Sequence, residues 1–146
     1  ESVSNLAIKT KKLINGLVLT SSITVANQKG ASLTNMHLEE ISIPTLVIAH
    51  NNDECRITPP SGAKMIYAML KSDMKVTYNN EKENISSTSG SKVIYEMLKE
   101  NINKELKYFD GGESEGNPCK AFAHHGYFKI EKEVVKYISS FIENNI

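Results

Sequence analysis

Residues 43–50, Ile-Pro-Thr-Leu-Val-Ile-Ala-His, form the strongest strand signal in the chain. Apolar residues fill this run with almost no alternation, which is typical of a strand that is buried on both faces of a sheet. Pro44 stands near its start, where a missing backbone N–H is tolerated. A shorter apolar run begins at Leu17, and residues 105–109 predict a further strand. Because doubly buried strands need helices on both sides, the pattern predicts an α/β fold.

Segments of helical periodicity separate these strands. We expect helices at 3–14, 61–71, 89–101 and about 129–143, a helical turn at 38–41, and a short strand at 75–78. In the first helix a loose apolar stripe is formed by Val3, Leu6, Ala7, Leu13 and Ile14, and in the second one side carries Met65, Ile66, Met69 and Leu70. We expect the last helix to bury Ile130, Val134, Val135, Ile138, Phe141 and Ile142. The alternation predicts a mostly parallel sheet flanked by helices, with right-handed crossovers.

Length and charge narrow the class of protein. The 146 residues are enough for one domain, which we place at 1–146. With 17 basic and 17 acidic residues the formal net charge is zero, which argues against nucleic-acid binding driven by bulk charge. No apolar run approaches the length of a membrane span, and no signal peptide is visible. No Gly-x-Gly-x-x-Gly follows a strand, so we expect no dinucleotide cofactor.

The chain contains an internal repeat. Residues 61–71, SGAKMIYAMLK, recur at 89–99 as SGSKVIYEMLK, with eight of eleven positions identical. A strand-like stretch follows each copy, so we interpret 61–78 and 89–109 as one duplicated helix-strand unit. Two copies are too few for a solenoid, which needs at least three repeats.

Two loops that follow predicted strands carry ionisable side chains. Residues 51–55, Asn-Asn-Asp-Glu-Cys, come after the strand at 43–50, and His124 and His125 lie in the loop after 105–109. In open α/β sheets, ligands bind beyond the carboxyl ends of the strands. A carboxylate from one loop and an imidazole from the other could therefore pair, so that the histidine can activate a nucleophile. The alternative interpretation is two polar loops with solvated side chains.

Several of these segments together resemble the C-terminal half of an α/β-hydrolase. They are residues 43–53 followed by Thr58-Pro59-Pro60 and a helix, His125-Gly126-Tyr127-Phe128 followed by the last helix, and the strand at 16–22. The resemblance implies that Asp53 is the acid and His125 the base of a catalytic triad, and that the substrate is a small-molecule ester or amide. His124 competes with His125, which we prefer because it directly precedes Gly126. We expect His50 to be structural and His37 to be solvated.

No serine of this sequence stands in the motif that the resemblance requires for the nucleophile. The family places its serine in a Gly-x-Ser-x-Gly turn upstream of the acid, and this sequence contains none. Ser21 and Ser22 follow a strand, but no helix follows them. We therefore expect the chain to begin after the nucleophile and to have the missing N-terminal half of the fold as its partner. The alternative function is a non-catalytic α/β interaction module, which needs no serine.

The chain has two cysteines, Cys55 and Cys119. If the acid and histidine loops meet, the two thiols come within disulfide range, and the alternative is two separate buried thiols. A bridge would favour an extracytoplasmic location. No Cys-x-x-Cys or His-x-x-x-His occurs, so the spacing does not indicate a metal site.

The duplication raises a geometric difficulty for the acid–histidine pair. If both strand-like stretches, 75–78 and 105–109, followed the strand at 43–50 in the sheet, the histidine loop would be displaced by about 4.8 Å. That exceeds the hydrogen-bond reach of about 3 Å. We therefore expect only one copy to occupy the position beside that strand, with the chain leaving the sheet near 79–84.

Overall fold

The computed structural model describes residues 2–9, 14–28, 30–70 and 103–146. Three strands lie in the order β1-β2-β3, and both neighbouring pairs are parallel. The strands are β1 (Leu17–Thr20), β2 (Thr45–His50) and β3 (Lys104–Phe109), and the helices are α1 (Ser2–Lys9), α2 (Pro60–Met69) and α4 (Glu131–Asn145). Short 3₁₀ turns are η1 (Leu33–Asn35), η2 (Leu38–Glu40) and η3 (His124–Gly126). The described part is therefore an α/β fold with a small parallel sheet.

β2 is the central strand, and all six of its residues are buried. Its β-branched and apolar side chains suit a pleated surface that is covered on both faces. Leu17 of β1 pairs in register with Thr45, and Phe109 of β3 pairs with His50. The parallel register brings the carboxyl ends of β2 and β3 to the same edge of the sheet.

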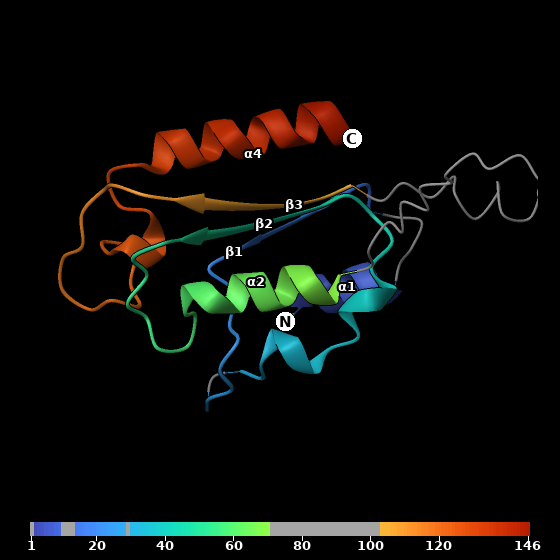
Figure 1. Cartoon of the computed structure of the whole chain (residues 1–146), viewed down its shortest axis with the longest axis horizontal. Coiled ribbons are helices and arrows are strands. Elements are labelled where there is room, and N and C mark those ends of the chain that lie inside the picture. The colour runs from blue at the N-terminus through green and yellow to red at the C-terminus, as the bar shows by residue number, and fades with distance from the viewer. Residues whose placement is uncertain (1, 10–13, 29, 71–102) are drawn as a thin grey trace, which may run out of the picture.

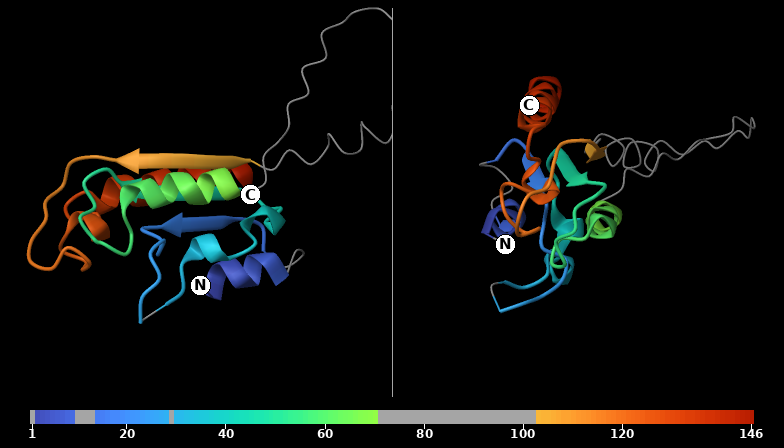
Figure 2. Two further views of the ribbon diagram at one scale, coloured as in Figure 1. Left: turned by 60° about the horizontal axis from the view of Figure 1, so that its bottom comes forward. Right: turned by 90° about the vertical axis from the view of Figure 1, so that its left-hand side faces the viewer.

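Helices cover the two faces of the sheet (Figure 1). Val47 and Ala49 of β2 join the core beneath α1, α2, η1 and η2, whereas Leu46 and Ile48 join the core beneath α4. Figure 2 shows the same three layers from two further directions. Within the described ranges, no helix is both long enough and apolar enough to cross a membrane.

The buried faces of the helices differ in part from the predicted apolar stripes. In α1, Ala7 and Ser4 face the core, whereas Val3 and Leu6 are about half exposed. In α2, Ile66 is buried, as is Leu70 directly after the helix, but Met65 is exposed. The apolar stripes therefore include residues that are not buried, because periodicity defines a stripe without locating the sheet beneath it.

α4 shows the same kind of difference at its exposed face. Val134 and Phe141 are buried, and Ile138 packs against them, as expected. Val135 and Ile142, predicted to be buried, are 60% and 42% exposed. These two residues lie one position beyond the helix face that contacts the strands.

β3 lies directly beside β2, so the stretch at 105–109 occupies the position next to the acid loop. The first copy of the repeat coincides with α2. The second copy at 89–99, the predicted helix at 89–101 and the predicted strand at 75–78 lie outside the described residues, as does the proposed departure from the sheet at 79–84. The duplication therefore stays a prediction.

Candidate active site

The structure brings Asp53 and His125 together at the carboxyl edge of the sheet. Asp53 lies in the turn that follows β2, where its N–H donates to the carbonyl of His50 at 3.1 Å. His125 lies in η3, in the segment that connects β3 to α4. Its Nδ1 is 3.1 Å from Oδ2 of Asp53 across 72 positions of sequence. The contact joins the two strand-end loops that we expected to meet, through the two residues that the resemblance implied.

The Asp53 carboxylate is almost completely shielded from water, with 2% of its side chain exposed. Its Oδ1 accepts from the N–H of Cys55 at 2.8 Å. Its Oδ2 accepts from the Thr58 hydroxyl at 3.0 Å as well as from His125. These donors replace the water that burial removes, so the carboxylate is held in one orientation.

The contacts of His125 fix its tautomer. An ionised carboxylate only accepts hydrogen bonds, so Nδ1 of His125 carries the proton and donates toward Asp53. Nε2 of the neutral ring then has a free lone pair. The ring is 23% exposed, and Nε2 has no hydrogen-bond partner among the described residues. This is the orientation that a general base requires.

Thr58 is a third member of the site. Its hydroxyl oxygen lies 3.0 Å from Nδ1 of His125 while its proton goes to Asp53. The side chain is held by the acid loop, because the Thr58 N–H donates to the carbonyl of Cys55. From the sequence we expected no role for Thr58 beyond its place in the segment before Pro59. Its position five residues after Asp53, just before a proline-started helix, was the available signal.

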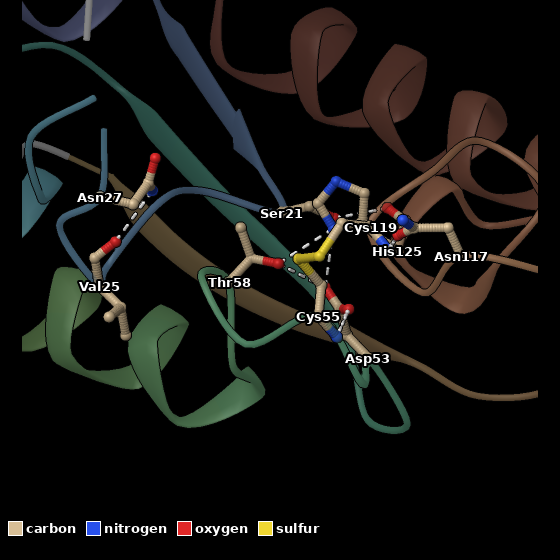
Figure 3. The surroundings of a disulfide bond; sticks show 9 residues. All are labelled: Ser21, Val25, Asn27, Asp53, Cys55, Thr58, Asn117, Cys119 and His125. Atoms are coloured by element: carbon tan, nitrogen blue, oxygen red, sulfur yellow. Dashed lines mark hydrogen bonds and ion pairs between the residues drawn. A yellow bond between two sulfur atoms is a disulfide. The ribbon is translucent and has the colours of Figure 1, made fainter. Parts of the chain in front are cut away.

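A disulfide joins the same two loops, between Cys55 and Cys119 (Figure 3). The two Cα atoms are 4.8 Å apart and the cysteines are 64 positions apart in sequence. Cys55 is buried and Cys119 is partly exposed. Cross-linking two loops so distant in sequence stabilises a fold by about 4 kcal/mol in the chain-entropy description. Here it also holds Asp53 and His125 in reach of each other.

Ser21, directly after β1, and Tyr127, directly after η3, hold the histidine loop in place. The Ser21 hydroxyl donates to the carbonyl of His125 at 2.8 Å and lies 3.2 Å from the Tyr127 hydroxyl, which donates to the carbonyl of Ile48. Burial raises the pKa of Tyr127 above its ordinary value, so this donor stays neutral. Ser21 has φ of 39°, a left-handed conformation that is costly for a residue with a side chain. Its hydroxyl bonds to the backbone of His125 and not to the ring.

The other histidines have separate places. His50 is fully buried, accepts from the N–H of Asn52 at Nδ1, and donates from Nε2 to the carbonyl of Gly111 at 2.9 Å. His124 stacks on His50 with ring centroids 4.5 Å apart, and its buried Nδ1 has no hydrogen-bond partner among the described residues. His37 is exposed and pairs with Glu39. His125 is thus the histidine that reaches the acid.

Gly126 explains why the chain turns so tightly after His125. A Cβ at this position would lie 2.3 Å from the carbonyl oxygen of Ala121 and 2.5 Å from its Cα. Both are backbone atoms, which cannot move aside as a side chain does. A residue without a side chain is therefore needed for η3 to pack against the preceding segment.

Asp53, Cys55 and His125 also form a cluster of potential metal ligands, with one donor atom from each within 4.8 Å of the others. In the disulfide form the sulfur of Cys55 is bonded to Cys119. A separate cleft of about 460 Å³ lies between the start of β3 and the end of α4, lined by Asn103, Glu105, Tyr137 and their neighbours. It is at the opposite end of β3 from His125.

Comparison with protein-family models, with curated proteins and with solved structures found no match to this chain. The resemblance to an α/β-hydrolase therefore stays a prediction from the sequence.

Proposed function

We propose that this chain supplies the acid and the histidine of an α/β-hydrolase type of catalytic centre, which cleaves an ester or amide bond. The observation that supports this most is the contact between Asp53 Oδ2 and His125 Nδ1 at 3.1 Å, together with a partly exposed ring whose Nε2 has no partner among the described residues. In His50, by contrast, both ring nitrogens are hydrogen-bonded.

Each residue has a specific role in the proposed reaction. Nε2 of His125 takes the proton of a hydroxyl nucleophile as that hydroxyl attacks the substrate carbonyl, and then gives the proton to the leaving group. The Asp53 carboxylate stabilises the positive charge that the ring carries in between. The Thr58 hydroxyl keeps the carboxylate oriented toward the ring. Ser21 and Tyr127 hold the backbone of the histidine loop in place.

The nucleophile of the proposed centre comes from outside the described residues. Ser21 is bonded to the backbone carbonyl of His125, and both cysteines are consumed by the disulfide. In the proposed arrangement a serine approaches Nε2 from the exposed side of the ring. The described part alone then has no activity of its own, since a triad without its serine retains only binding and oxyanion stabilisation.

The deciding experiment uses the protein isolated from its natural source. Its intact mass under denaturing conditions is compared with the 16.2 kDa of this sequence, and the native protein is treated with a serine-reactive organophosphonate. We expect one labelled serine, either in additional covalent sequence or in a co-purifying chain, and we expect His125→Ala to abolish the labelling. A protein of 16.2 kDa with no partner and no labelled serine would rule out the hydrolase.

That second outcome would favour a non-catalytic α/β interaction module. The observation that favours such a module is that no hydroxyl or thiol of the described residues contacts Nε2 of His125. In such a module the pair of Asp53 and His125 serves only to hold two loops together, as the disulfide does. Asp53→Asn would then change stability without changing any chemical activity.

A further inference from the structure

We propose that reduction of the Cys55–Cys119 disulfide converts this edge of the sheet into a tetrahedral zinc site. The ligands are the Asp53 carboxylate, the two thiolates of Cys55 and Cys119, and Nδ1 of His125. This inference does not depend on the proposed function, because the four side chains can bind a metal whether or not a serine is supplied.

The cluster already has nearly the dimensions of a zinc site. Donor atoms of Asp53, Cys55 and His125 lie within 4.8 Å of one another, and Asp53 Oδ2 is 3.1 Å from His125 Nδ1. Zinc bonds of 2.0–2.3 Å in a tetrahedron place ligand atoms about 3.3–3.8 Å apart. A contraction of about 1 Å at the sulfur would therefore close the site around the ion.

Cys119 provides the fourth ligand because its sulfur is bonded to that of Cys55. After reduction the two sulfurs move apart from bonding distance, and the Cys55 sulfur stays within 4.8 Å of donor atoms of Asp53 and His125. The loop that carries Cys119 is largely exposed over 110–117, so its backbone can adjust. Two thiolates, one imidazole and one carboxylate are all ligands that zinc accepts.

Surrounding groups already orient these ligands. The N–H of Cys55 donates to Oδ1 of Asp53 and the Thr58 hydroxyl donates to Oδ2, which leaves the carboxylate fixed toward the cluster. Hydrogen bonds of this kind to a coordinating group raise metal affinity. Thr58 gives up its contact with Nδ1 of His125 on binding and keeps its bond to Asp53.

A small-molecule thiol is the reductant of the Cys55–Cys119 disulfide in this proposal. One thiol attacks the partly exposed Cys119 sulfur and releases the Cys55 thiolate, and a second thiol then frees Cys119, so that two thiols become one disulfide. Zinc binding releases the thiol protons of both cysteines. The proton of His125 moves from Nδ1 to Nε2, where it faces solvent, with no net change.

The test compares the full chain in its oxidised and reduced forms. A phosphine is used as the reductant, because it contains no thiol that would compete for zinc, and binding is measured by competition with a chromophoric chelator. We expect one zinc per chain in the reduced form and none in the oxidised form. Asp53→Asn and His125→Ala each remove a ligand, so each should weaken zinc binding by more than the about 10- to 100-fold that loss of a supporting residue costs. Asp110→Asn and His37→Ala should leave zinc binding unchanged.

Two results would overturn the site. If the reduced Asp53→Asn and His125→Ala variants bound zinc as tightly as the reduced unmutated chain, the two thiols would be binding the ion alone. A reduced chain that is unfolded by circular dichroism, and that zinc does not refold, would mean that the four ligands never assemble. Cobalt(II) titration of the unmutated reduced chain gives a check without variants, since intense visible bands indicate tetrahedral coordination, and weak octahedral bands would contradict it.

Discussion

The Thr58 hydroxyl lies 3.0 Å from Nδ1 of His125, and the same hydroxyl donates to the carboxylate that His125 faces. The Nδ1 proton is thus shared between a neutral oxygen and a charged one. Thr58 closes a three-membered ring of contacts with Asp53 and His125. This arrangement holds the carboxylate and the imidazole together more tightly than their direct contact alone.

Removal of the Thr58 hydroxyl tests this ring of contacts. Thr58→Val keeps the shape of the side chain and leaves Asp53 with one donor fewer in a buried place, which should lower the free energy of unfolding by about 1–3 kcal/mol. Urea denaturation measures the change. Thr58→Ser retains the hydroxyl and should lose much less stability, and an equal loss in both variants would assign the effect to packing.

Asp53→Asn tests the proposed catalytic role in the natural protein that carries the nucleophile. An amide cannot hold His125 in the required tautomer or stabilise the imidazolium, so turnover should fall about 10,000-fold with little change in KM. Steady-state hydrolysis of an ester substrate provides the measurement. Asp110→Asn makes the same chemical change at an exposed aspartate that contacts Asn51, and should retain activity. Unchanged turnover in Asp53→Asn would exclude the acid role.

Loss of the disulfide should mainly lower the free energy of unfolding. We expect the Cys55→Ala and Cys119→Ala double variant to lose up to about 4 kcal/mol of unfolding free energy, because its unfolded chain is no longer cross-linked. Chemical denaturation of oxidised, reduced and double-variant chains makes the comparison. Added reductant should destabilise the unmutated chain and leave the variant unaffected, whereas a reductant effect on the variant would point to another cause.

Gly126→Ala should disturb the site through the backbone. Its Cβ would lie 2.3 Å from the Ala121 carbonyl oxygen, so η3 must shift and His125 must shift with it. We expect a larger loss of unfolding free energy than in Gly116→Ala, where nothing lies within 4 Å and only the positive φ opposes a side chain. Ala121→Gly should fail to rescue Gly126→Ala, because the obstructing atoms are backbone.

Alkaline pH should weaken the support of the histidine loop. Burial holds the pKa of Tyr127 above its ordinary value of 10, so the folded state keeps this proton more tightly than the unfolded state does. The stabilisation is therefore complete below pH 10 and is lost as the pH rises toward the folded-state pKa. Tyr127→Phe removes the group, so its stability should fall less steeply above pH 10 than that of the unmutated chain. If the unfolding free energy fell equally steeply above pH 10 in both chains, this account would be contradicted.

The sequence predicted the strands that position the site more successfully than it predicted side-chain burial. The predicted strands at 17–19, 43–50 and 105–109 became β1, β2 and β3. The signal was strongest for β2, because a strand that is buried on both faces has a continuous apolar run. Helix faces were less predictable. Met65, Val135 and Ile142 belong to apolar stripes but lie outside the contact with the sheet, and only the docking angle of each helix decides that.

The candidate site, like the fold, could be predicted from the sequence only in part. The position of two loops after parallel strands predicted that an acid and a histidine could meet, and the resemblance to an α/β-hydrolase implied that they are Asp53 and His125. The role of Thr58 depends on a turn geometry that no local pattern specifies, and the stacking of His124 on His50 depends on the register of β2 and β3. The metal-ligand cluster combines residues from two loops, so short spacing motifs could not indicate it.

The disulfide has a consequence for how the protein would respond to proteases. Cys55 and Cys119 bracket residues 56–118, so a single cut anywhere in that stretch would separate the peptide carrying Asp53 from the peptide carrying His125 without releasing either one. A nicked chain would migrate as one species on a non-reducing gel and as two after reduction. Asp53 and His125 would then stay together although the backbone between them is cut.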